Sequence, residues 1–290
     1  MLHDPRPPVA PNALPFARSS DAQEALLPRQ FHLGQPHLSV AGLSVAWLIE
    51  QCGHRHRWSI AESLRTLPGL IRDAAGRPVL TPVVTARISG FTHSFRADEE
   101  VTLAFTLEPR AENGWRSEHA LVGSRGNALT VELVTAFTPA PAEELTTLTQ
   151  SKMPPHLEPE RDSGLARRTR VLRARGRAAE AIAGTQAVMP TITMPAIGGL
   201  LHDGAALPCL AAMSRLFQAA ETAAGRGEAA PISARELHLV RGMAQSEAVT
   251  VTVSAGLPET AGGGRSGQLA TARRFSDDQV LALSATTRGV

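Results

Sequence analysis

Two histidines stand close together at the end of a long apolar segment in the first half of the sequence. His54 and His56 flank Arg55 and directly follow Cys52-Gly53. Imidazole gains and loses its proton near neutral pH, so either side chain could act as a general base. Alternatively, one of them ends a helix by bonding a backbone carbonyl, or Cys-x-His-x-His binds a metal, although no fourth ligand is evident. Catalytic and structural roles both stay open for this pair.

A second polar group precedes the same apolar segment. Pro36-His37 is followed by Ser39, Gly42 and Ser44, just ahead of the predicted helix. Free backbone N–H groups at a helix N-terminus stabilise negative charge and can polarise a carbonyl group. We therefore expect His37 to be a candidate base, with Ser39, Gly42 and Ser44 in the loop that would bind the substrate.

A comparable group stands in the second half of the chain. Gly198-Gly199 leads through two leucines to His202-Asp203, again ahead of an apolar segment. His202 with Asp203 could form an oriented base, although adjacent residues often point apart. Gly198 and Gly199 would supply backbone amides to a bound carbonyl group.

The elements that must position these groups follow from hydrophobic spacing. Apolar residues at helical intervals predict helices over 43–64, where a break at Gly53 is left open, and over about 206–224. Runs rich in β-branched residues predict strands after each helix. The first set comprises Val79–Ile88, Glu100–Leu107, Arg116–Val122 and Ala128–Phe137, and the second comprises Glu236–Arg241, Ala248–Ala255, Gln268–Phe275 and Val280–Thr287.

One helix followed by four strands therefore occurs twice, and the two halves align in order. Glu99–Thr106 matches Glu247–Ser254, and Leu129–Val134 matches Leu281–Thr286. A helix followed by antiparallel strands is the order in which a curled sheet wraps a helix, so the fold class is α+β. Composition divides the chain into a proline-rich arm (1–30), a first half (31–138), a linker with a basic patch (139–178) and a second half (179–290).

The overall composition excludes several classes of protein. The net charge of +2 comes from 29 basic and 27 acidic residues that are mixed along the chain, which argues against nucleic-acid binding. Two distant cysteines provide neither a disulfide framework nor a zinc knuckle. The absence of a long apolar span or a leader-like N-terminus predicts a cytoplasmic protein without a membrane segment.

Three segments resemble a known protein family. Phe31–Leu38, Gly42–Leu48 and Cys52–Trp58 are similar to the LnmK acyltransferase/decarboxylase family of secondary-metabolite clusters. The resemblance implies a double hot-dog fold and work on acyl groups carried by coenzyme A or an acyl carrier protein, as in polyketide biosynthesis. It implies no tightly bound cofactor beyond that acyl-CoA or phosphopantetheine carrier, and it leaves a homodimer open.

The sequence departs from this family at its nucleophile. The family's activity is associated with a tyrosine on the strand after the central helix, and this chain contains 0 tyrosines. Because the chain has no tyrosine, acyl transfer through tyrosine is excluded. We place Leu80 near the missing hydroxyl. Either another group supports acyl transfer, decarboxylation or hydrolysis, or the protein is a non-catalytic accessory that binds an acyl group or a carrier protein.

Overall fold

The protein was analysed as a computed structural model. It describes residues 26–39, 42–67, 70–72, 76–77, 79–110, 114–136, 138–139, 174, 192–193, 210–224, 232–241, 248–255 and 266–288. The expected arm 1–30 and linker 139–178 lie mostly outside these ranges. Residues 26–30 belong to the strand β1 (Leu26–His32), which pairs with β6 at the edge of the sheet. An edge position accommodates Pro28, because proline cannot donate to a neighbouring strand.

The predicted order of one helix and four strands is confirmed in both halves. In the first half, α1 (Val45–Ser63) precedes β5 (Val83–Ser89), β6 (Glu100–Arg110), β7 (Gly114–Gly123) and β8 (Ala128–Ala136). In the second half, α3 (Leu210–Ala223) precedes β11 (Ile232–Leu239), β12 (Ala248–Ala255), β13 (Ser266–Arg274) and β14 (Val280–Arg288). The shorter elements are η1 (Gln35–His37), β2 (Leu38–Ser39), β3 (Gly42–Leu43), β4 (Val79–Leu80), η3 (Thr92–Ser94), β9 (Thr138–Pro139) and β10 (Ile192–Thr193).

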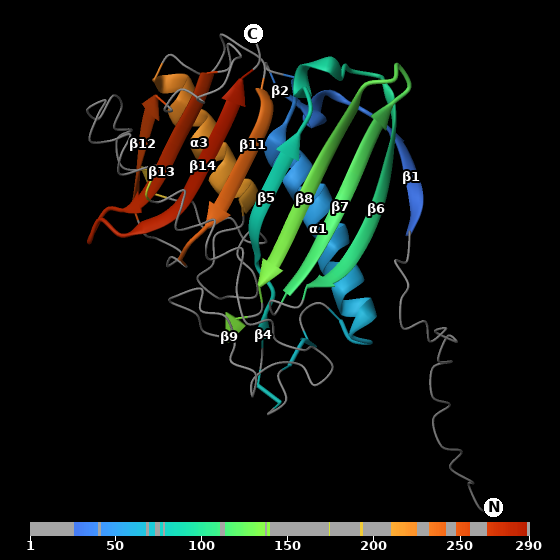
Figure 1. Cartoon of the computed structure of the whole chain (residues 1–290), viewed down its shortest axis with the longest axis horizontal. Coiled ribbons are helices and arrows are strands. Elements are labelled where there is room, and N and C mark those ends of the chain that lie inside the picture. The colour runs from blue at the N-terminus through green and yellow to red at the C-terminus, as the bar shows by residue number, and fades with distance from the viewer. Residues whose placement is uncertain are drawn as a thin grey trace, which may run out of the picture.

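The strand order of the main sheet is symmetric about its centre. Its ten strands follow the order β1-β6-β7-β8-β5-β11-β14-β13-β12-β10, so β5 and β11 join the halves and corresponding strands lie at corresponding distances from that junction. β5 and β11 pair antiparallel, with Ile88 opposite Arg235. Figure 1 shows α1 and α3 against the same face of this sheet. The internal repeat is thus a repeat in space.

The first helix corrects one detail of the sequence analysis. α1 continues without a break through Gly53, so His54 and His56 lie within the helix and not at its end. Its N-terminus is capped by Ser44, whose Oγ accepts the backbone N–H of Trp47 at 3.3 Å. Burial of Leu48, Ile49 and neighbouring apolar residues against the sheet outweighs the cost of about 1 kcal/mol for glycine in a helix.

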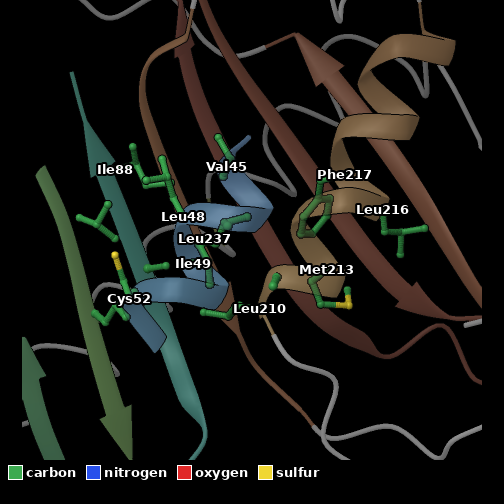
Figure 2. Packing of buried hydrophobic residues seen from close by; sticks show 14 of the residues in the cluster. Val45, Leu48, Ile49, Cys52, Ile88, Leu210, Met213, Leu216, Phe217 and Leu237 are labelled. Carbon is green, nitrogen blue, oxygen red and sulfur yellow. The ribbon is translucent and has the colours of Figure 1, made fainter. Parts of the chain in front are cut away.

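The two helices share one apolar core. They run in opposite directions side by side (Figure 2), and Leu48, Ile49 and Cys52 of α1 belong to the same buried cluster as Met213 and Phe217 of α3. Burial raises the pKa of the Cys52 thiol to about 12, so this thiol is an inert core group.

The register of the repeat is confirmed in one strand and corrected in another. Val101 and Val249 are both buried on the helix side, as the alignment of β6 with β12 requires. In β8 and β14 the equivalent residues facing the helices are Thr135 and Thr286, whereas the sequence alignment matched Val134 with Thr286. A shift of one residue turns every side chain to the other face of a sheet, which is why sequence similarity alone misplaced it.

Candidate functional site

Contacts within the loop that precedes α1 fix the N-terminus of this helix. The ring of His37 lies 4.6 Å from that of Trp47, and His37 Nδ1 accepts the backbone N–H of Gly34 at 2.8 Å. The backbone N–H of Ser44 donates to the carbonyl of His37 at 2.9 Å. His37 and Ser44 are therefore close together, and their contacts hold the start of the helix in place.

Ser39 and Gly42 complete this loop. Ser39 Oγ donates to the carbonyl of Gly42 at 3.0 Å. Gly42 has φ +98°, and a Cβ there would clash with the backbone of Thr92 and His93 in η3. Glycine is needed because the chain combines a left-handed conformation with close backbone approach.

His54 and His56 point in different directions from α1. His54 is exposed, with its ring 6.2 Å from that of Trp58 on the surface. His56 is fully buried beneath the helix. The two imidazoles therefore cannot act on one substrate group, as their proximity in the sequence suggested they could.

His56 belongs to a buried polar group that the sequence analysis missed. Its Nδ1 lies 2.7 Å from Ser117 Oγ, its Nε2 lies 2.6 Å from Thr135 Oγ1, and Ser117 Oγ lies 2.9 Å from His119 Nε2. We call His56, Ser117, His119 and Thr135 the first polar cluster. The signal available in the sequence was the alternation Ser117-x-His119 in a strand, which places both residues on one face.

The first polar cluster is neutral. Burial, assisted by the charge of Arg57, lowers the pKa of His56 to about 3. Burial also lowers the pKa of His119 well below its ordinary value, with smaller effects from His56 and Arg55. A serine between two histidines is a pattern of nucleophilic catalysis. Here both nitrogens of His56 have partners and all of the cluster is buried, so these contacts stabilise the core.

A second buried polar group lies beneath α3. Glu221 Oε1 binds Arg235 Nη2 at 2.8 Å and Glu221 Oε2 binds Arg288 Nη2 at 3.3 Å. Thr286 Oγ1 donates to Glu221 Oε1, and Arg235 Nε donates to Ser284 Oγ, both at 3.3 Å. We call these five residues the second polar cluster. No local spacing in the sequence links Glu221 to β14, the last strand, so none of these residues was predicted.

The predicted site residues of the second half cannot be placed. Gly198, Gly199, His202 and Asp203 lie outside the described residues, so their roles stay predictions. Leu80 lies in β4, opposite Thr138 of β9.

In the part of the chain that the structure describes, no helix has the length and apolar character needed to cross a membrane.

No protein-family model and no curated protein sequence matches this chain. Solved structures do match. A 12:0-ACP thioesterase from Umbellularia californica has a TM-score of 0.59 and 10% identity, with 90% of this chain and 92% of that chain covered. A protein assigned as an oleoyl thioesterase from Lactobacillus plantarum gives 0.63 and 13%, with 91% and 95% covered. An acyl-ACP thioesterase from Bacteroides thetaiotaomicron gives 0.52 and 9%, with 89% and 96% covered.

These similarities show the fold alone. Together with the antiparallel sheet and its central helices, they identify a hot-dog fold, which confirms that part of the sequence prediction. A MaoC-like dehydratase also matches, with a TM-score of 0.50 and 9% identity over 86% of this chain and 85% of that one. Since one fold supports hydrolysis and dehydration, the reaction must be argued from the site.

Proposed function

We propose that this protein binds the acyl thioester of an acyl carrier protein or coenzyme A and hydrolyses it. The observation that carries the proposal is the pairing of α1 and α3 over one sheet, in a chain that follows three structures named as thioesterases over 89–91% of its length. The palindromic strand order supports the finer assignment of a double hot-dog, with two such units in one chain.

The apolar region between the helices is where we propose that the acyl chain binds. It is formed by α1 and α3 above and by Ile88 and Leu237 of the two central strands below (Figure 2). Aliphatic chains gain about 0.8 kcal/mol for each methylene removed from water, so such a surface supplies affinity without polar contacts.

The chemistry must come from a group other than tyrosine. We propose His202, oriented by Asp203, as the general base, with backbone amides of Gly198 and Gly199 stabilising the oxyanion. His202 would take a proton from water as its oxygen bonds to the carbonyl carbon. The C–S bond then breaks, and the departing thiolate receives that proton. The support is indirect: His37 and His56 are occupied by internal contacts, and His54 is on the surface.

A second candidate is a non-catalytic protein that binds an acyl group or a carrier protein. The absence of tyrosine and the structural use of His37 and His56 favour it. A place in polyketide or other secondary-metabolite biosynthesis follows only from the sequence resemblance and is part of the proposal. So is self-association into a homodimer, which light scattering of the purified chain would test.

The proposed function can be tested by thiol release from a panel of acyl-coenzyme A and acyl-carrier thioesters of increasing chain length. We expect thiol release by the unmodified protein and a loss of about 100-fold or more in His202→Ala, the scale of general base catalysis. His54→Ala, which alters an exposed histidine, is the matched control and should keep full activity. Thioester binding without thiol release by any variant would establish the accessory protein. If the protein neither bound a thioester nor released a thiol, both functions would be excluded.

A further inference from the structure

The second polar cluster contains a charged donor that lacks a partner among the described residues. Arg235 is fully buried, and within the part of the chain that the structure describes its Nη1 makes no hydrogen bond, while its Nε donates to Ser284 and its Nη2 to Glu221. Leaving a buried charged donor unpaired is costly, and nearly all such groups in proteins have partners. The open position calls for an acceptor.

The charge of the cluster favours an anionic acceptor. One carboxylate, that of Glu221, is shared between the guanidinium groups of Arg235 and Arg288. Burial lowers the pKa of Arg235, and Arg288 lowers it further, whereas Glu221 raises it. A guanidinium binds carboxylates with strong, charge-assisted hydrogen bonds, which a neutral ligand would not match.

The surroundings of Arg235 indicate what carries the anion. Arg235 lies directly opposite Ile88 of β5 and Thr286 of β14, so these three side chains share the helix face of the sheet. Leu237 follows on the same face of β11, and Ile88 and Leu237 are part of the apolar region between the helices (Figure 2). An aliphatic chain against Ile88 and Leu237 would end at Arg235.

We propose that Arg235 Nη1 binds the carboxylate of an aliphatic chain held in this apolar region. The inference rests on the proposed function for the place of the chain and adds the chemistry of its end. Two ligands share that chemistry: a free fatty acid, which hydrolysis would produce, and an acyl thioester that carries a second carboxylate at its far end.

The test compares decanoate with methyl decanoate by isothermal titration calorimetry on the full chain. We expect decanoate to bind at least about tenfold more tightly, since a hydrogen bond to a charged group contributes on that scale. Arg235→Leu should abolish the difference and leave methyl decanoate binding unchanged. Arg125→Leu, which removes an exposed arginine from the turn after β7, is the control and should behave like the unmodified protein.

A second variant protects the test against damage to the fold. Glu221→Gln removes the carboxylate that competes for Arg235, so decanoate should bind this variant more tightly than the unmodified protein. Added decanoate should also raise the melting temperature of the variant by more than it raises that of the unmodified protein. A damaged fold would weaken binding. Equal binding of acid and ester by the unmodified protein, or weaker decanoate binding by a Glu221→Gln variant whose circular dichroism spectrum matches that of the unmodified protein, would overturn the inference.

The two sources of the carboxylate are separated by decanoyl-coenzyme A and its analogue with a terminal carboxyl group. Preference for the carboxylated thioester, lost in Arg235→Leu, assigns the site to the substrate. Preference for decanoate alone assigns it to the product. Binding of decanoate through Arg235 without binding of any thioester would refute the proposed function but not the carboxylate site. Thioester hydrolysis without a preference for the carboxylate would refute the carboxylate site but not the proposed function.

Discussion

His56 and Glu221 occupy the same position in the two helices, and each bonds a threonine of the sheet. Each follows the first residue of its helix by eleven positions, from 45 to 56 in α1 and from 210 to 221 in α3. His56 contacts Thr135 of β8, and Glu221 contacts Thr286 of β14, the corresponding strand. The halves therefore share one scaffold, in which the first position is neutral and the second is charged.

Replacing His56 by alanine should lower the free energy of unfolding by about 2–4 kcal/mol. The change leaves a cavity and removes a bonding partner from Ser117 and Thr135. Urea denaturation would measure the loss. His54→Ala, two residues away on the exposed side of α1, should stay within about 0.5 kcal/mol of the unmodified protein. Equal losses in both variants would show that the helix, and not the cluster, is responsible.

The first polar cluster should also make stability depend on pH. The pKa of His56 falls from 6.5 to about 3 on folding, so between these values the unfolded state binds more protons than the folded state. Its contribution is complete above pH 6.5 and is lost progressively as the pH falls toward 3, by at most about 1.4 kcal/mol per unit. Urea titrations at intervals from pH 7 to 4.5 should show this slope. His56→Gln should reduce it, and an unchanged slope would assign the effect to other groups.

Breaking the second polar cluster should cost more than breaking an exposed ion pair. Glu221→Ala leaves Arg235 without the carboxylate that binds its Nη2, so we expect a loss of about 3–5 kcal/mol. Glu50→Ala, which breaks the exposed pair between Glu50 and Arg215, should cost less than about 1 kcal/mol. Thermal and urea unfolding of both variants would decide, and similar losses would mean that the buried pair is no stronger than the exposed one.

Gly42 should tolerate no side chain. Gly42→Ala forces a Cβ into the backbone of η3 at a left-handed φ of +98°, so it should lower stability by more than about 2 kcal/mol. Gly126 is a matched control, because it has φ +82° but open space around its Cα. Gly126→Ala should therefore cost only the conformational penalty of about 1 kcal/mol. If both variants lose the same amount in urea, the close approach to η3 is not the cause.

The sequence by itself determined the elements of this protein and their order. Helical spacing of apolar residues located α1 and α3, and β-branched runs located all eight long strands after them, because these periodicities are local properties of the chain. The repetition of one helix and four strands was enough to predict the hot-dog arrangement. Whether α1 continues through Gly53 was left open by the sequence, because the burial that keeps the helix continuous outweighs a local propensity.

Only the tertiary structure decided which polar residues lie in the interior. His56 was noticed for its neighbour His54, yet its partners Ser117 and Thr135 lie 61 and 79 residues further along the chain. Glu221 and Arg288 are separated by 67 residues, and no motif links them. A buried polar group is stable only where partners converge on it from several elements, so the strand order and the register, which no single segment encodes, select the residues that form each cluster.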